Sequence, residues 1–238
     1  QPTLFDTAEY GLNFDSLFRE NRYVGADRQG DANQITAALT SRVFSSDSGA
    51  EWLSASLGQT FHFDDRRVQL PGMPVETATQ SSMVGQLSSQ LTAELAASLY
   101  MQWDPDSSKT EKSAVQMQYL DDERRIFNLA YRYEDNPVDA NYNQEQVDTS
   151  FLLPVSSKWN LVGRWNYSLE DDKTLDRFAG IEYSDCCWAF RFVGRNYVND
   201  NETTTGVFLQ LELKGLGSIG HRADEEIADG VLGYRVGY

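Results

Sequence analysis

Residues 93–104 read Ala-Glu-Leu-Ala-Ala-Ser-Leu-Tyr-Met-Gln-Trp-Asp, and their side chains alternate between apolar and polar. Successive side chains of a β-strand point to opposite faces, so this stretch predicts a strand with one apolar and one polar face. A soluble helix would not sort its polar residues with a period of two. The apolar face holds Ala93, Leu95, Ala97, Leu99, Met101 and Trp103, and the polar face holds Glu94, Ser98, Tyr100, Gln102 and Asp104.

The same period recurs along most of the chain and predicts about eleven strands of roughly ten to thirteen residues. Such lengths suit a tilted strand that crosses a bilayer, and they exceed the five or six residues usual in soluble sheets. Aromatic residues gather near many of the predicted strand ends, where the interface girdles of a membrane barrel would lie. The alternation that predicts these strands is seen in residues 33–44, 53–63, 83–91, 93–104, 115–119, 127–133, 147–153, 159–169, 175–183, 188–195 and 204–214.

Charge and hydropathy limit the classes of protein that this chain can belong to. The net charge of -16 disfavours nucleic acid as a partner, because phosphates require a basic surface. No run of about 18 apolar residues occurs, which excludes a membrane-spanning helix. A mean hydropathy of -0.51 is still compatible with a barrel, because only alternate residues of each strand would face lipid.

We therefore predict an all-β fold, an antiparallel transmembrane β-barrel in which this chain supplies about eleven strands of a larger barrel. Eleven is odd, and an open sheet would expose strand edges inside lipid, so the missing strands are expected outside this sequence. The predicted regions are a long loop of extracellular type at 1–32, barrel strands at 33–216 and a C-terminal tail at 217–238. A β-sandwich core is the alternative, disfavoured because charged and amide side chains line the second face of nearly every strand.

Enzyme chemistry finds little support in the sequence. Gly215-Leu-Gly-Ser-Ile-Gly220 matches a dinucleotide fingerprint, but eighteen residues follow it, too few for a βαβ unit, and a flexible turn is expected instead. His62 and His221 lack the spacing of a zinc site. We predict no catalytic residue, no metal site and no cofactor.

The chain has two cysteines, and they are adjacent, Cys186 and Cys187. Neighbouring cysteines rarely bond to each other, because the ring that would form is strained. In an oxidising compartment their partners would be on another segment or another chain.

Several motifs resemble the outer-membrane lipopolysaccharide-assembly protein family, LptD. They span nearly the whole chain, and the segment that contains the cysteine pair is the most specific. The motifs are Tyr10-Gly-Leu-Asn-Phe-Asp-Ser-Leu-Phe18, Asn21-Arg-Tyr-Val-Gly-Ala-Asp-Arg-Gln-Gly-Asp-Ala-Asn33 with Ser41-Arg42, Asp64-Asp-Arg-Arg-Val68, Gly180-Ile-Glu-Tyr-Ser-Asp-Cys-Cys-Trp188 and Phe208-Leu-Gln-Leu-Glu-Leu-Lys-Gly-Leu-Gly217.

The resemblance implies that this chain is the C-terminal portion of a non-enzymatic barrel in the outer membrane of a Gram-negative bacterium. Such a barrel receives lipopolysaccharide from the periplasmic bridge protein LptA and releases it into the outer leaflet between its first and last strands. The implied partners also include the plug lipoprotein LptE, the rest of LptD and, during folding, the barrel-assembly machinery. A passive diffusion porin is the alternative function.

The resemblance also implies roles for named residues. Cys186 and Cys187 would each form a disulfide with a cysteine in the family's N-terminal region, outside this chain. The last strand would form one side of the lateral gate, through Thr204, Val207, Leu209, Leu211 and Leu213.

Overall fold

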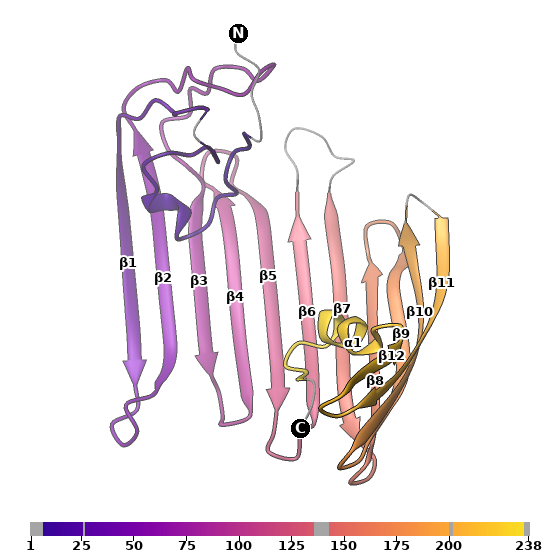
Figure 1. Cartoon of the computed structure of the whole chain (residues 1–238). Helices are drawn as coiled ribbons and strands as arrows, with labels where there is room; N and C mark the ends of the chain where they lie inside the picture. The colour runs from indigo at the N-terminus through magenta and orange to yellow at the C-terminus, as the bar shows by residue number, and fades with distance from the viewer. Residues whose placement is uncertain (1–6, 26, 136–142, 200–201, 236–238) are drawn as a thin grey trace. The chain divides into compact units, whose positions relative to one another are not determined.

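A computed structural model describes residues 7–25, 27–135, 143–199 and 202–235. Its regular elements are almost all strands (Figure 1). The two helices are the short 3₁₀ helix η1 (Ser16–Phe18) and α1 (Ala223–Gly230). The strands are β1 (Gln34–Phe44), β2 (Glu51–His62), β3 (Met83–Gln90), β4 (Leu95–Asp104), β5 (Lys109–Leu120), β6 (Ile126–Glu134), β7 (Gln144–Pro154), β8 (Trp159–Ser168), β9 (Lys173–Ser184), β10 (Trp188–Asn199), β11 (Glu202–Leu213) and β12 (Gly217–Gly220).

The strands form one sheet in which each strand neighbours the next in sequence, from β1 to β12. Every strand pair with a described register is antiparallel. The predicted all-β antiparallel fold is confirmed, and the sheet is open, with β1 and β12 at its ends. Each of the eleven predicted strands is present. Among the residues that the structure covers, no helix is long and apolar enough to cross a membrane.

The last short strand was not predicted. Gly217–Gly220 was expected to belong to a flexible turn, but its backbone pairs with Gln210–Leu213 of β11. The predicted tail thus contains β12 and α1, whereas the predicted first loop contains η1 and an isolated bridge between Glu9 and Tyr23. Residues 1–6, 26 and 236–238 of these two regions lie outside the described residues.

The chain divides into two compact units. Unit 1 comprises Gln1–Ser89 with Leu99–Ser113, and unit 2 comprises Gln90–Ser98 with Ala114–Tyr238. Each unit contains strands whose two faces differ in chemistry, and in each a non-strand segment covers part of the polar face.

In unit 1 the covering segment is the loop around η1. Leu17 of this loop is buried, and its side chain lies directly over Gly58 of β2, where a Cβ atom would come within 2.8 Å of it. The Thr36 hydroxyl donates to the Leu17 carbonyl oxygen at 3.0 Å, and the Tyr100 hydroxyl donates to the Leu12 carbonyl oxygen at 2.6 Å. Polar side chains of β1 and β4 therefore hold the loop against the sheet.

A second loop, residues 63–82, is joined to the first through one carboxylate. Asp31 accepts hydrogen bonds from the backbone N–H groups of Arg67 at 2.7 Å and Val68 at 3.2 Å, and from the Arg22 guanidinium at 3.2 Å. Burial raises the pKa of Asp31, but these donors outweigh it and hold the pKa below its ordinary value. The buried Tyr23 hydroxyl donates to the Val68 carbonyl oxygen at 2.7 Å. The two loops thus form one ordered layer.

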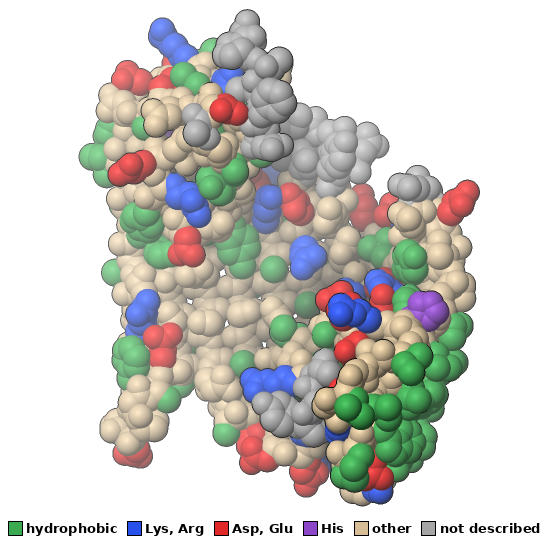
Figure 2. Space-filling model, viewed as in Figure 1, with side chains coloured by type: hydrophobic (Ala, Val, Ile, Leu, Met, Phe, Trp, Pro, Cys, Tyr) green, Lys and Arg blue, Asp and Glu red, His purple; other side chains and the backbone are tan. Residues whose placement is uncertain are grey.

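In unit 2 the sheet has an exposed apolar face, here named the outer face. Its residues stand opposite one another across neighbouring strands, as Phe192 does with Ile181 and Leu209. Hydrophobic side chains gather over the last strands of this unit (Figure 2). The exposed members include Phe127, Leu129, Leu161, Trp165, Phe192, Leu209, Leu211 and Leu213.

The opposite, inner face of unit 2 is mostly polar, yet it carries one apolar patch, and α1 lies on that patch (Figure 1). Ile227 and Val231 of the C-terminal segment are completely buried. Burying such side chains stabilises the helix position by about 1.5–3 kcal/mol each. The cluster consists of Ile126, Leu152, Val162, Phe178 and Val193 of the sheet with Ala223, Ile227, Val231 and Tyr234.

Candidate functional site

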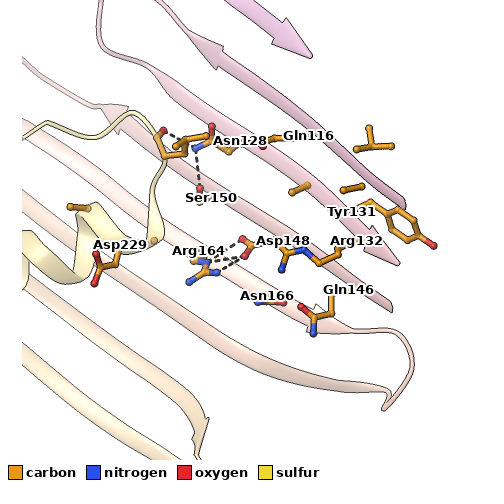
Figure 3. Close-up of a pocket in the computed structure, with 16 residues that line it drawn as sticks. Gln116, Asn128, Tyr131, Arg132, Gln146, Asp148, Ser150, Arg164, Asn166 and Asp229 are labelled. Carbon is orange, nitrogen blue, oxygen red and sulfur yellow. Dashed lines mark hydrogen bonds and ion pairs between the residues drawn. The ribbon is translucent and has the colours of Figure 1, made fainter. Parts of the chain in front are cut away.

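A pocket of about 310 Å³ opens on the inner face of unit 2, between strands β5 to β8 and the residues at the end of α1 (Figure 3). Amide and charged side chains dominate the labelled lining. They come from alternate positions of neighbouring strands, because only every second side chain points to this face. The polar members include Gln116, Asn128, Gln146, Asp148, Arg164 and Asn166.

The charges at the pocket floor are balanced by ion pairs. The Arg164 guanidinium contacts Asp148 at 2.5 Å and Asp176 at 3.1 Å. Asp176 also accepts from Arg195 at 2.9 Å, and Arg195 reaches Glu226 of α1 at 2.5 Å. This chain of alternating charges fixes the guanidinium groups and links the wall of the pocket to the helix.

Amide groups hold the backbone that follows α1. The Asn128 side chain donates to the Leu232 carbonyl oxygen at 3.0 Å and to the Ser150 hydroxyl at 3.1 Å, and Gln118 donates to the same carbonyl at 3.2 Å. The Oδ1 atom of Asn166 is buried and has no hydrogen-bond partner among the described residues. Within the described part of the chain, no group of three or more His, Cys, Asp or Glu side chains that could hold a metal ion occurs.

A buried ionic network lies on the same face, nearer the end of the sheet. Arg191, with only 2% of its surface exposed, contacts Glu182 at 2.6 Å and Glu212 at 2.7 Å. Glu182 also accepts from the Asn160 amide at 2.8 Å and the Tyr234 hydroxyl at 2.7 Å. Burial, together with the Glu182 charge, raises the pKa of Tyr234 well above its ordinary value, so the phenol remains a donor. This network does not follow from the sequence pattern, because Arg191 and Glu182 meet through strand register and Tyr234 reaches them from the C-terminal segment.

The two cysteines lie in the short connection between β9 and β10. Both are exposed and both are free thiols, with 2.8 Å between the two sulfur atoms. The thiol of Cys187 contributes most to raising the pKa of Cys186. Their exposure leaves both residues accessible to another segment or chain. The predicted disulfides with cysteines outside this chain stay a prediction.

The residue before the cysteine pair carries an ion pair of its own. Asp185 accepts from the Lys158 ammonium at 2.6 Å and from the Tyr183 hydroxyl at 3.1 Å. The Lys158 hydrogen bond, followed by the backbone N–H of Cys186, lowers the pKa of Asp185 to about 2. Next to this turn the rings of Trp159, Tyr183 and Trp188 pack in series, with centroids 4.9 Å and 4.7 Å apart.

The predicted gate residues all lie on β11, but on two faces. Val207, Leu209, Leu211 and Leu213 are exposed on the outer face, the last three opposite Phe192, Phe190 and Trp188 of β10. Thr204 pairs with Tyr197 and lies on the inner face. On its other side β11 pairs with β12, over Gln210–Leu213 only.

Comparisons with known proteins match one family. The family model described as LptD, LPS transport system D, matches residues 2–159. An LPS-assembly protein LptD of Nitrosococcus oceani is 39% identical over 97% of this chain and 31% of its own length. Proteins with the same name are 36% identical in Xanthomonas oryzae pv. oryzae, over 97% of this chain and 30% of the relative, and in Hahella chejuensis, over 94% and 28%. The chain thus spans about a third of the length of these relatives.

Proposed function

The chain belongs to the LptD family, and from that membership we propose that it is the C-terminal part of an outer-membrane translocon for lipopolysaccharide. In this proposal the complete barrel delivers lipopolysaccharide to the outer leaflet through a lateral gate between its first and last strands. The proposal includes no enzymatic role for the chain, and its relatives are named as assembly proteins.

The observation that carries the proposal is the division of the sheet into two chemically different faces. In unit 2, Leu129, Leu161 and Leu209 are exposed on one face, while Glu182 and Arg191 lie on the other. A soluble sheet would bury the apolar face, whereas a barrel wall turns it to lipid and its polar face to a wet interior. An amphipathic molecule such as lipopolysaccharide needs both environments during transfer.

The lateral gate is proposed on β11. Leu209, Leu211 and Leu213 would contact acyl chains, because they extend from the outer face on the strand next to the end of the sheet. Val207, two residues before Leu209 on the same face, would also contact acyl chains, and Thr204 would face the interior. A cysteine pair that locks this strand to the first barrel strand of the full-length protein should stop transfer, and reduction should restore it.

The partners follow from the same proposal. The polar inner face, with the Arg164 and Asp176 ion pairs, would contact the plug lipoprotein LptE. The periplasmic bridge protein LptA would supply the lipid, and the barrel-assembly machinery would insert the protein. The exposed Cys186 and Cys187 would bond to cysteines of the preceding LptD residues.

Depletion of the full-length protein in its own bacterium tests the function. Newly made lipopolysaccharide should then accumulate before the outer leaflet, and re-expression should restore surface delivery. Normal surface delivery in depleted cells would contradict the proposal. A purified protein that conducts ions like an open pore, with no effect on lipopolysaccharide delivery, would favour a porin.

A further inference from the structure

The C-terminal segment, residues 217–234, contacts the sheet in two different places. Its first part is β12, which lies at the edge of β11, with Leu211 opposite Ile219. Its second part, α1 and the turn after it, lies on the inner face of the same unit. The segment therefore runs around the end of the sheet, from edge to inner face.

Glycines allow the edge part to fold back closely. Gly215, Gly217 and Gly220 all have positive φ angles, which glycine adopts without strain. At Gly220 a Cβ atom would lie 2.2 Å from the Leu209 carbonyl oxygen, so a larger residue cannot occupy this position without separating the strands. The pairing continues one residue further, because the His221 N–H donates to the Leu209 carbonyl oxygen at 2.9 Å.

Packing and hydrogen bonds anchor the second part. Ala223, Ile227 and Val231 are completely buried against the sheet. The Asp224 N–H donates to the Gln210 side chain at 3.0 Å, and Tyr234 donates to Glu182. This second part, here named the anchor, is therefore attached to β9 and β11, close to the edge that β12 covers.

Only part of the β11 edge is covered. The strand runs from Glu202 to Leu213, and β12 pairs with its last four residues. Within the described residues, no strand pairs with Glu202–Phe208 on that side. An uncovered strand edge is a template for pairing with another strand.

We propose that residues 217–234 are a strap that keeps the Gln210–Leu213 part of the β11 edge closed and confines pairing with any other strand to Glu202–Phe208. The inference rests on the proposed lateral gate and adds its regulation: one part of the gate strand is free to pair, and release of the strap frees Gln210–Leu213 as well. The anchor on the inner face sets how readily the strap leaves, so a molecule bound there can influence the edge.

Hydrogen exchange of the full-length protein in detergent tests the strap. Amides of residues 217–221 should exchange at least about a hundredfold more slowly than in a free peptide, because they belong to a folded element. Gly220→Val should remove this protection while residues 223–231 stay protected. Gly215→Asn is the matched control, because its Cβ would meet open space and asparagine tolerates positive φ, and it should keep the protection.

A milder variant covers the case in which Gly220→Val does not fold. Tyr234→Phe removes the hydrogen bond that the phenol donates to Glu182 and the one that it accepts from Arg191, and should speed exchange at 217–221 about fivefold. Free-peptide exchange of this segment in the unmodified protein, or no response to Tyr234→Phe, would overturn the proposal.

Photo-crosslinking identifies the neighbour of the covered part and of the uncovered part of the edge. With benzoylphenylalanine at position 211 of the full-length protein, adducts should form with residues 217–221, besides the adjoining β10. At position 207 adducts with that segment should be absent. Adducts between position 211 and the first barrel strand would contradict the strap. Normal surface delivery of lipopolysaccharide in cells depleted of the protein, with intact adducts at 217–221, would instead contradict the proposed function alone.

Discussion

The two units cover their polar faces in different ways. In unit 1 the cover is a loop, held by hydroxyl groups that donate to its backbone carbonyls and by one buried leucine, Leu17. In unit 2 the cover is α1, held by an apolar cluster and by the buried ions around Arg191. A hydrogen bond from a neutral hydroxyl contributes about 0.5–1.5 kcal/mol, whereas removal of one partner of a buried ion pair costs about 3–5 kcal/mol. The cover of unit 2 should therefore be the more sensitive to substitution.

Removal of the buried guanidinium should have the largest effect. Arg191→Ala leaves Glu182 buried beside Tyr234 without its cation, so we expect a loss of about 3–5 kcal/mol in the free energy of unfolding of the full-length protein. Denaturant unfolding in detergent measures it. Arg222→Ala is the control, since its side chain is 72% exposed and should change stability by about 0–1 kcal/mol. Equal, small effects of both variants would mean that the network does not hold unit 2 together.

A cavity under α1 should cause the second-largest loss of stability. Ile227→Ala removes a completely buried side chain, and we expect a loss of about 2–3 kcal/mol, the lower part of the usual range, because a surface helix can settle into the space. Hydrogen exchange of residues 223–231 reports it locally. Leu232→Ala, at an exposed position, should leave that exchange unchanged. Identical exchange in the two variants would show that the apolar cluster is not the anchor.

Crowding beneath the loop of unit 1 should have a smaller effect. Gly58→Val would place atoms against Leu17 and Ala38, and we expect about 1–3 kcal/mol of local destabilisation with faster exchange in residues 12–18. Gly85→Ala offers a matched control, because its Cβ would meet Leu57 at an ordinary 3.6 Å. If Gly58→Val left the exchange of residues 12–18 unaltered, the loop would not rest on β2.

The smallest effect should come from the exposed ion pair beside the cysteines. The pKa of Asp185, lowered to about 2, should rise toward its ordinary value of about 3.9 in Lys158→Met. A carboxyl whose folded pKa is depressed adds stability above its unfolded pKa, and this contribution disappears as pH falls from about 4 to about 2. The carboxyl NMR shift of Asp185 during an acid titration measures the change. An unshifted midpoint in Lys158→Met would show that the ammonium is not the cause.

The strands could be predicted because the two-residue period is a local property. The alternation at 93–104 becomes β4 (Leu95–Asp104), and the pattern at 159–169 becomes β8 (Trp159–Ser168). The cover of unit 2 could not be predicted in the same way. β12 is a four-residue strand with a glycine at each end, and α1 is an eight-residue helix whose position depends on packing against distant strands.

The candidate site was predictable only in part. Gate residues on one strand and two adjacent cysteines are visible in the sequence, because each lies in a single segment. The contact between Arg191 and Glu182 depends on how the turn at Asp185 sets the register of β9 against β10. The pocket near Arg164 also needs Leu232, which is far away in sequence. Contacts between distant segments of this kind do not follow from periodicity.

One measurement tests the central claim, the opposite chemistry of the two faces of the sheet, most directly. Leu129 and Arg132 are both exposed and lie on β6 on opposite faces, since successive side chains alternate. Benzoylphenylalanine at each position of the full-length protein in its native membrane should give phospholipid adducts at position 129 and none at position 132. Lipid adducts at position 132, or their absence at position 129, would contradict the claim.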